Sequence, residues 1–219
     1  EGERRRSQAF VDLMIPVVKG WSTESGVSMA SIGVQVHGGM GYVEETGAAQ
    51  HLRDAQISTI YEGTTGIQAN DLIGRKMARE GGATLHAVIG LMRGVAGELG
   101  ARSGDDFAAL QRRLSAAVDA LAAAGEWLVA NYGKDVRAAS AGAVPFLMLL
   151  GVVAGGWQMA RAALVAQTKI DAGDADPFYP AKIGTARFYA DHVLSQASGL
   201  ASSVIDGAAG VLALPEDMF

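Results

Sequence analysis

The sequence predicts an all-α fold made of helical bundles. Segments in which apolar and polar residues alternate are nearly absent, and almost every long segment spaces its apolar residues three or four apart, as a buried helix face requires. The 219 residues, 49% of them hydrophobic and 19% charged, are enough for one or two domains with a sizeable core. Alanine and glycine are abundant and aromatic residues are few, so we expect helices that approach one another closely.

The first 82 residues are expected to form helices interrupted by glycine. Pro16 can occupy the first turn of a helix, because its missing N–H would have no partner there. This helix is expected to end near His37. Thr64 or Thr65 suits the N-cap of a later helix, since the hydroxyl can accept a free backbone N–H. In chain order the expected segments are an amphipathic stretch at 3–13, helices at 16–37 and 44–56, an extended stretch at 57–61 and a helix at 64–82.

The rest of the chain is expected to form a bundle of longer helices. Asp105 and Asp106 begin one of them, because negative charge stabilises the N-terminal end of a helix dipole, and Gly133 ends it. Its apolar residues recur at alternating steps of three and four, the pattern of a bundle helix: Phe107, Leu110, Leu114, Ala117, Leu121, Ala124 and Leu128. The other expected helices are 84–100, 138–170 and 181–209.

A shift in composition between residues 81 and 104 indicates a boundary between two helical units. We place these units at residues 1–82 and 83–219.

Residues 138–160 contain no charged side chain and are long enough to span a bilayer, for which about 20 apolar residues suffice. Ser140, Pro145 and Gln158 interrupt this stretch, and several glycines lie in it. We therefore favour a buried central helix over a membrane span.

The charge pattern does not favour nucleic-acid binding. The formal net charge is −5, and no expected helix carries the stripe of Lys and Arg that would neutralise phosphates. Arg4, Arg5 and Arg6 form a short run that is more typical of a solvated helix end.

The chain has no cysteine, which excludes disulfides, thiolate catalysis and cysteine-based metal sites. This composition fits a reducing compartment, and we expect a cytoplasmic location without a signal peptide. The histidines His37, His51, His86 and His192 show no metal-ligand spacing, and no HExxH motif occurs, so no metal site is expected. No GxSxG motif supports a nucleophilic triad.

Two glycine-containing segments carry the remaining candidates for chemistry. Gly38–Gly39–Met40–Gly41 lacks the lysine of a phosphate loop and follows a helix, so a helix C-cap and turn is favoured over a ligand loop. Glu62 stands between an apolar stretch and a helix start, where a carboxylate could be tuned as a general base. Gly63 would permit close approach of a ligand. On residue chemistry alone, a helix-capping Glu62 remains the alternative.

The stretch from Gln35 to Lys76 closely resembles the C-terminal signature of acyl-CoA dehydrogenases. That signature combines a Q-x-x-GG-x-G segment, an L-x-R-D-a segment and an I-Y-E-G-T-x-x-I-Q segment. All three occur in the same order and at the same spacing, within QVHGGMGYVEETGAAQHLRDAQISTIYEGTTGIQANDLIGRK. The match is far more specific than a single glycine loop.

The resemblance implies a flavin-dependent dehydrogenation of an acyl-CoA thioester to a 2-enoyl-CoA. In this family a base removes a proton from the α-carbon, and the β-hydrogen leaves as hydride to FAD. The glutamate of the Y-E-G-T motif is that base in many members and matches Glu62, with Gly63 beside the substrate thioester. The segments that match the family's FAD contacts are Thr64, Thr65 and Gly66, and, toward the flavin of a neighbouring subunit, Gln35, Val36, His37, Gly38 and Gly39. Arg53 and Asp54 are expected to have a structural, ion-pairing role.

The second half, with PFLMLLGVVAGGWQMARAAL and AKIGTARFYADHVL, resembles the extra C-terminal helical domain of one branch of this family, which includes proteins similar to 3-methylmercaptopropionyl-CoA dehydrogenase. Residues 1–82 would then be the end of the family's helical C-terminal domain, and 83–219 the added bundle. The implied partners are an acyl-CoA substrate, electron-transfer flavoprotein and further copies of the chain, as a dimer or tetramer.

The family also has an N-terminal helical domain and a middle β-domain, which these residues do not contain. The chain starts at Glu1 inside what reads as a helix turn, so we expect a fragment of a longer enzyme that is inactive by itself. The alternative is a non-catalytic helical assembly module that retains the signature.

Overall fold

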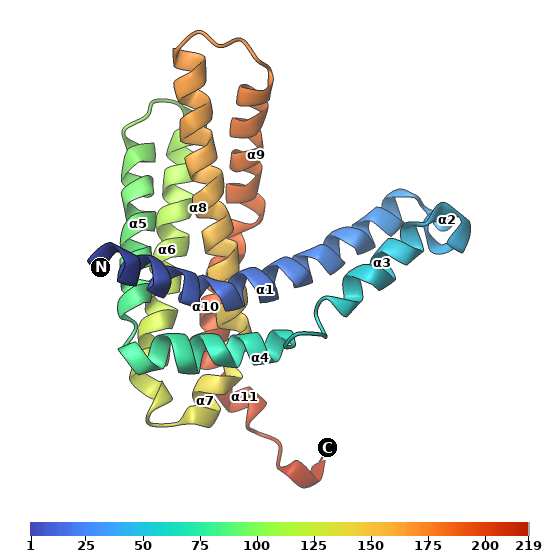
Figure 1. The fold of residues 1–219 in the computed structure, drawn as a ribbon, viewed down its shortest axis with the longest axis vertical. Coiled ribbons are helices and arrows are strands. Elements are labelled where there is room, and N and C mark those ends of the chain that lie inside the picture. The colour runs from blue at the N-terminus through green and yellow to red at the C-terminus, as the bar shows by residue number, and fades with distance from the viewer. Residues whose placement is uncertain (219) are drawn as a thin grey trace.

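The computed structural model describes residues 1–218, and this range contains helices and turns but no strand. An upright bundle is crossed by two helical segments, one of which continues far beyond the bundle (Figure 1). The predicted all-α class is confirmed. The helices of the bundle are α5 (Ala83–Gly100), α6 (Asp105–Tyr132), α8 (Ala143–Asp171), α9 (Phe178–His192) and α10 (Ala197–Asp206).

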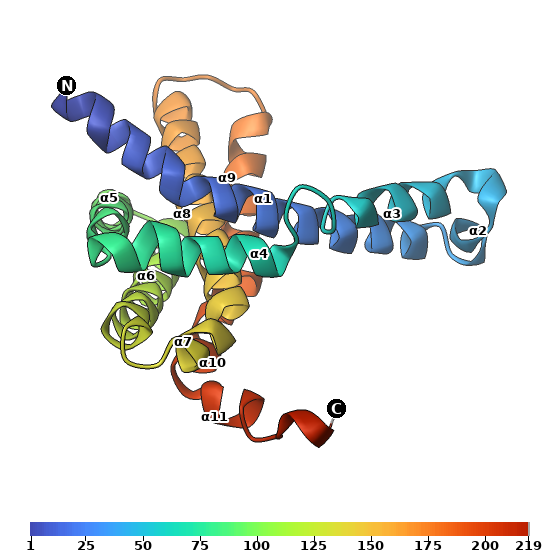
Figure 2. The same ribbon diagram turned by 60° about the horizontal axis from the view of Figure 1, so that its bottom comes forward.

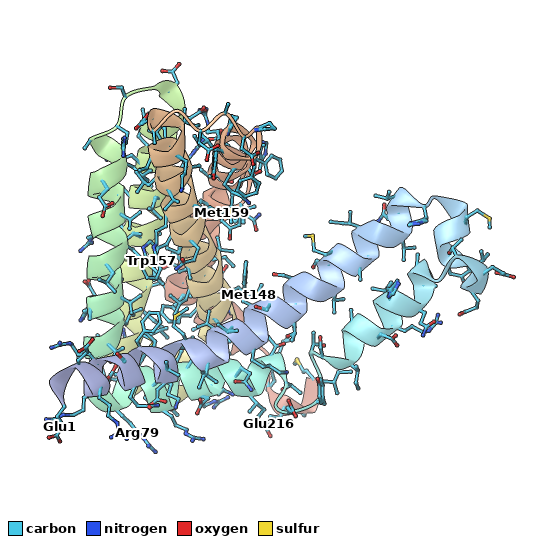
Figure 3. All side chains as sticks on the ribbon, turned by 45° about the horizontal axis from the view of Figure 1, so that its top comes forward. Glu1, Arg79, Met148, Trp157, Met159 and Glu216 are labelled. Atoms are coloured by element: carbon cyan, nitrogen blue, oxygen red, sulfur yellow. The ribbon has the colours of Figure 1, made fainter. Side chains whose placement is uncertain are left out.

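The α8 helix is the centre of the bundle. It contacts α5, α6, α9 and α10, and also the two crossing segments, so it is buried on nearly every side. It is the one helix in the described range that is long and apolar enough to cross a membrane, and 67% of its most apolar window is buried inside the fold. The interpretation of this stretch as a buried central helix is confirmed. Met148, Trp157 and Met159 lie along it (Figure 3).

The spacing of apolar residues on α6 predicted its buried face. All seven positions expected to face the core are buried: Phe107, Leu110, Leu114, Ala117, Leu121, Ala124 and Leu128. The opposite face of α6 carries charged residues, two of which join α9. Arg113 pairs with Asp191 at 3.4 Å, and Arg187 pairs with Asp106 at 3.1 Å. A hydrogen bond from Arg187 lowers the pKa of Asp191.

The crossing segments are α1 (Gly2–Val36) and the continuous run of α4 (Thr65–Asn70), the π-helical η2 (Asp71–Met77) and the short η3 (Ala78–Glu80). Beyond the bundle, α1 is accompanied by the elements that fold back along it (Figure 2): α2 (Gly39–Tyr42), η1 (Glu44–Thr46) and α3 (Ala48–Ile57). We call residues 24–57, which project from the bundle, the arm.

Glycines on α8 let neighbouring helices approach closely, as the composition predicted. A Cβ built on Gly151 would lie 2.2 Å from Cγ of Trp21, so the indole of α1 occupies the space that a side chain would need. A Cβ on Gly155 would lie 2.3 Å from the Tyr189 hydroxyl, which donates a hydrogen bond to the carbonyl oxygen of Val152 at 3.0 Å.

Two predictions are wrong in the first half of the chain. The predicted break before Pro16 does not occur, because α1 runs through it without interruption. Pro16 lacks the N–H that would bond to Asp12, but it is buried between Leu13 and Val17, and this packing offsets the lost bond. The stretch 57–61 is not extended: Ile57 ends α3, and consecutive hydrogen-bonded turns follow.

The predicted helices of the second half are divided at glycines and at one irregular residue. The helix expected from residue 138 is α7 (Val136–Ala141) and α8, separated at Gly142, which lies against the backbone of Val204. The last predicted helix is divided at Val193 and at Gly207 into four pieces: α9, η4 (Leu194–Gln196), α10 and α11 (Ala208–Val211).

The chain reverses at Gly81 and Gly82, both of which have positive φ angles, just where we expected the boundary between residues 1–82 and 83–219. The buried side chains on both sides of this turn nevertheless belong to one continuous core. The division into two domains stays a prediction.

The close approach of α1 to α8 predicts a strong effect of one added methyl group. Gly151→Ala should destabilise the fold by about 1–3 kcal/mol, because the new methyl group overlaps Trp21 and forces the two helices apart. Gly90→Ala on α5 is the matched control, since nothing lies within 4 Å of its built Cβ. Alanine there should be neutral or stabilising, by up to about 1 kcal/mol. Urea unfolding of both variants tests this, and equal midpoints would contradict it.

The burial of the Tyr189 hydroxyl leads us to predict that the folded protein loses stability at alkaline pH. Burial raises its pKa to about 12, whereas tyrosine in an unfolded chain titrates near pH 10. The buried phenol therefore favours the folded state fully below about pH 10, and this contribution is lost as the pH rises toward 12. The free energy of unfolding, measured between pH 9 and 12, should fall less steeply with pH in Tyr189→Phe than in the unchanged protein. The exposed Tyr42→Phe should behave as the unchanged protein, and the same slope for all three would refute the assignment.

Candidate functional site

The predicted base lies in the turn that joins α3 to α4. Glu62 has a φ of 55°, in the left-handed region, and Gly63 follows with a φ of 94°. The left-handed conformation costs a residue with a Cβ roughly 1–2 kcal/mol, so neighbouring contacts must hold it. Thr64 caps α4, because its hydroxyl accepts the backbone N–H of Ile67 at 3.4 Å, which confirms the predicted cap. The Glu62 side chain is exposed.

Side chains from α1 and α4 hold this turn. The Lys19 ammonium donates to the carbonyl oxygens of Ser58 at 2.9 Å and Gly63 at 2.6 Å. The Gln68 amide donates to the carbonyl oxygen of Glu62 at 3.3 Å. Sequence reasoning missed Lys19, and it included Gln68 as the last residue of the I-Y-E-G-T-x-x-I-Q segment without giving it a role. Lys19 lies 44 residues from Gly63, and its position in the apolar run around Pro16, Val17 and Val18 was the one available signal.

The start of α4 has a second connection to α1. The Thr65 hydroxyl donates to the Glu24 carboxylate at 2.5 Å. The first backbone N–H groups of a helix have no partner inside the helix, and those of Thr65 and Gly66 remain open for a ligand. A Cβ built on Gly66 would meet nothing closer than 3.9 Å, so there is room beside the helix start. Gly63 is different, because a Cβ there would lie 2.7 Å from the Gln68 amide nitrogen.

The other predicted cofactor segment, Gln35 to Gly39, lies at the far end of the arm, where α1 ends. His37 ends the helix, and its Nδ1 lies 3.0 Å from the Gly33 carbonyl oxygen. Gly38 then turns the chain with a φ of 61°. The predicted helix end and turn at this glycine cluster is therefore confirmed. All five residues are exposed, and no contact here tests their predicted role as cofactor ligands.

The fold does not bring the two predicted cofactor segments together within one chain. On α1, Glu24 lies beside the Glu62 turn, because it accepts a hydrogen bond from Thr65. Gln35 lies 11 residues further along the same helix. At about 1.5 Å per helical residue this separates them by about 16 Å. The structure therefore presents two separate exposed surfaces at the two ends of the arm.

The remaining candidates are Arg53 and the four histidines. Arg53 pairs with Glu44 at 2.7 Å and so joins α3 to η1; the hydrogen bond raises the pKa of Arg53. This confirms the expected ion-pairing role of Arg53. The histidines His37, His51, His86 and His192 lie on separate elements, and among residues 1–218 no group of three or more His, Cys, Asp or Glu could hold a metal ion.

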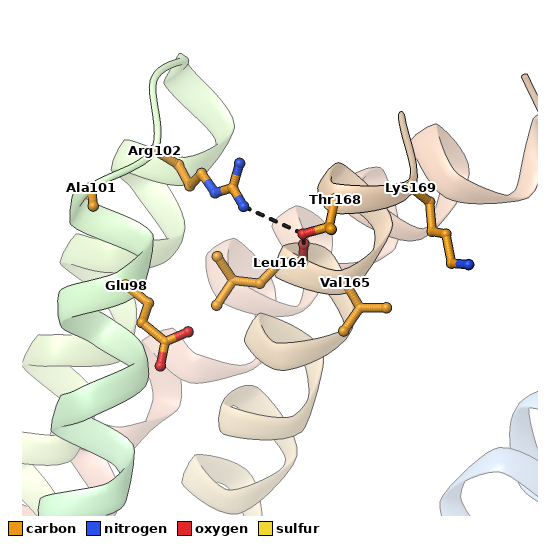
Figure 4. Close-up of a pocket in the computed structure, with 7 residues that line it drawn as sticks. All are labelled: Glu98, Ala101, Arg102, Leu164, Val165, Thr168 and Lys169. Atoms are coloured by element: carbon orange, nitrogen blue, oxygen red, sulfur yellow. Dashed lines mark hydrogen bonds between the residues drawn. The ribbon is translucent and has the colours of Figure 1, made fainter. Parts of the chain in front are cut away.

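A shallow surface pocket lies elsewhere, between the C-terminal end of α5 and α8 (Figure 4). Arg102 crosses it and donates to the Thr168 hydroxyl at 3.3 Å and to Asp171 at 2.8 Å. None of the site residues predicted from the sequence lines it. Its lining is a mixture of apolar and singly placed charged side chains, with Arg102 paired to Asp171, and suggests no chemistry.

Comparison with known proteins identifies both halves of the chain. The family model described as "Acyl-CoA dehydrogenase, C-terminal domain" matches residues 4–77, and the model described as "Acetyl-CoA dehydrogenase C-terminal like" matches residues 83–215. A 3-methylmercaptopropionyl-CoA dehydrogenase of Ruegeria pomeroyi is 45% identical over 206 residues, which are 94% of this chain and 35% of that protein.

Two further relatives are also named as dehydrogenases of acyl-CoA thioesters. A broad-specificity linear acyl-CoA dehydrogenase of Mycobacterium tuberculosis is 36% identical over 84% of this chain and 31% of its own length. A butyryl-CoA dehydrogenase of Syntrophomonas wolfei is 25% identical over 99% of this chain and 36% of its own length. The chain thus spans about a third of each of these relatives. Together, the family models and relatives show that the chain belongs to the acyl-CoA dehydrogenase family, as its C-terminal helical part.

Proposed function

We propose that this chain is the C-terminal portion of an FAD-dependent acyl-CoA dehydrogenase and supplies its catalytic base. The observation that carries the proposal is Glu62, an exposed carboxylate with a left-handed backbone, in a turn whose carbonyl oxygens accept hydrogen bonds from Lys19 and Gln68. The reaction is the α,β-dehydrogenation of an acyl-CoA thioester to a 2-enoyl-CoA. The printed names of the relatives share the acyl-CoA thioester and differ in the acyl group, so we propose the thioester and no particular acyl chain.

In this proposal the Glu62 carboxylate takes the proton from the substrate α-carbon. The backbone of Gly63 would lie beside the thioester, while the space of its missing side chain is taken by the Gln68 amide. FAD, when bound, accepts the β-hydrogen as hydride. The residues of this chain fit such a ring beside Glu62, because the N–H groups of Thr65 and Gly66 are open and the space next to Gly66 is free. Thr64, Thr65 and Gly66 would hold the flavin next to the base.

The second surface, Gln35 to Gly39, leads to the proposal of a homo-oligomer. It lies about 16 Å along α1 from the turn of Glu62, on a separate and exposed surface of the arm. We propose that it touches the flavin of a neighbouring subunit in a dimer or tetramer. Electron-transfer flavoprotein as the acceptor and a cytoplasmic location belong to the same proposal.

The alternative function is a helical assembly module without catalysis, and one observation favours it. Large apolar side chains are exposed along the arm, which is typical of a surface covered by another protein: Met29, Ile32, Val36, Met40 and Tyr42. A catalytic subunit that assembles would expose the same residues, so the two functions are separated by activity measurements.

The first measurement is the effect of Glu62→Gln in the protein that carries this chain, with all flanking sequence that its gene encodes. Turnover of acyl-CoA should fall by about 10²- to 10⁴-fold, because an amide cannot take the α-proton. Bound flavin should stay at the level of the unchanged protein. Glu126→Gln, an exposed glutamate on α6, is the matched control and should leave turnover unchanged. Full activity of Glu62→Gln would place the base elsewhere.

The second measurement concerns the 219 residues by themselves. This polypeptide, mixed with FAD and an acyl-CoA, should not reduce an electron-accepting dye, since it spans about a third of its relatives and contains neither an N-terminal helical domain nor a β-domain. Robust dye reduction would show that the described helices are a complete enzyme.

A further inference from the structure

We infer that Lys19 is a positioning residue, which sets the direction of the Glu62 carboxylate by bridging two carbonyl groups of the turn. This inference rests on the proposed function, in which Glu62 is the base. It concerns a side chain that lies on a different helix, 43 positions earlier in the chain.

The two carbonyls lie at the two ends of the turn. Ser58 follows the last residue of α3, and Gly63 precedes the N-cap of α4. The Lys19 ammonium is 2.9 Å from the first carbonyl oxygen and 2.6 Å from the second. One cation therefore closes the loop 58–63, and Glu62 lies one residue before the second anchored carbonyl.

The chemistry of this contact is favourable for a lysine. The last carbonyl groups of a helix have no partner within the helix and carry partial negative charge, which a cation stabilises. An ammonium has three N–H donors in a compact head and can serve two carbonyls that point at it from different directions. Lys19 is half-buried, and a charged donor makes shorter and stronger hydrogen bonds than a neutral one.

The contact also fixes the backbone around Glu62. A peptide unit is planar and trans, so its carbonyl and its N–H point in opposite directions. Because the Gly63 carbonyl points at Lys19 on α1, the N–H of Thr64 points away from α1. The Gln68 amide holds the preceding peptide unit through the Glu62 carbonyl. The peptide units on both sides of Gly63 are thus held, which fixes the backbone of Gly63 and anchors the peptide unit that follows the Cα of Glu62.

Lys19 is itself rigidly placed. The α1 residues around it are buried: Leu13, Pro16, Val17 and Gly20. A Cβ built on Gly20 would lie 2.9 Å from a methyl group of Leu147 on α8, so the helix is in close contact with the core just after Lys19. The lysine thus connects the position of an exposed carboxylate to the interior of the bundle.

The test uses Lys19→Met in the flavin-loaded protein that carries this chain. Methionine keeps the length of the side chain and removes its donors. The substrate is whichever of butyryl-CoA, 3-methylmercaptopropionyl-CoA and octanoyl-CoA the unchanged protein turns over fastest. We expect flavin reduction in a single turnover to slow by about tenfold to a hundredfold, as for a misplaced reacting group, with KM within about threefold. The isotope effect of an α-deuterated substrate should rise, because proton transfer becomes rate-limiting.

A second readout does not depend on activity. Amide hydrogen exchange of the segment 58–64 should become faster in Lys19→Met, while exchange in α5 stays unchanged. Lys19→Arg keeps the charge but spreads its donors over a planar fork, so its rate should lie between those of the unchanged protein and Lys19→Met. If Lys19→Met does not accumulate as a flavoprotein, the same rate and exchange measurements on Lys19→Arg test the inference.

Two controls separate positioning from a general structural effect. Gly151→Ala should lower the melting temperature without changing the isotope effect, since it acts at the contact of α1 with α8. Lys169→Met, an exposed lysine on α8, should change none of these quantities. An isotope effect that rises equally in Gly151→Ala and Lys19→Met would overturn the inference in favour of simple destabilisation.

The inference and the proposed function fail in different ways. If Glu62→Gln abolishes turnover while Lys19→Met keeps the rate, the isotope effect and the exchange of segment 58–64, then Glu62 is the base and Lys19 does not position it. If Glu62→Gln retains turnover, the proposed function is wrong, and a rate loss in Lys19→Met would then no longer support positioning of a base.

Discussion

The packing of α1 across α8 is the contact on which the rest of the structure depends. Trp21 occupies the space above Gly151, and Leu147 lies against Gly20, so the two helices meet at glycines on both sides. This contact places the middle of α1, from Leu13 to Gly20, against the core of the bundle. The C-terminal end of α1 is free to project as the arm, with both exposed segments of the acyl-CoA dehydrogenase signature on it or at its base (Figures 1 and 2).

The same contact explains how an exposed turn can be rigid. Loops that project from a bundle have few buried contacts and tend to open locally. The turn at Glu62 avoids this because its hydrogen bonds come from Lys19 and Gln68, on two helices that are themselves packed on α8. A catalytic group requires a fixed position, and a side chain anchored on a buried helix helps to supply it by holding the backbone of the turn.

Much of the fold follows from local patterns. The buried face of α6, the cap at Thr64 and the turn at Gly38 were predicted from spacing, hydroxyl chemistry and glycine, which act within a few residues. The predictions that failed depend on distant contacts. Pro16 continues a helix because the core covers it, and Gly142 divides a helix because the Val204 backbone lies against it. The roles of the predicted site residues involve groups from outside this chain, so neither local patterns nor these helices test them.

By itself the sequence determined the helical class, the central buried helix and, through three spaced motifs, the acyl-CoA dehydrogenase family with Glu62 as its candidate base. These features reside in periodicity and in short segments, where neighbouring residues carry the whole signal. The tertiary structure alone decided that the two signature segments lie at opposite ends of an arm and that Lys19 holds the turn of Glu62. Hydrogen bonds between residues about forty positions apart leave no periodic trace in a sequence, because they arise only after the helices have packed.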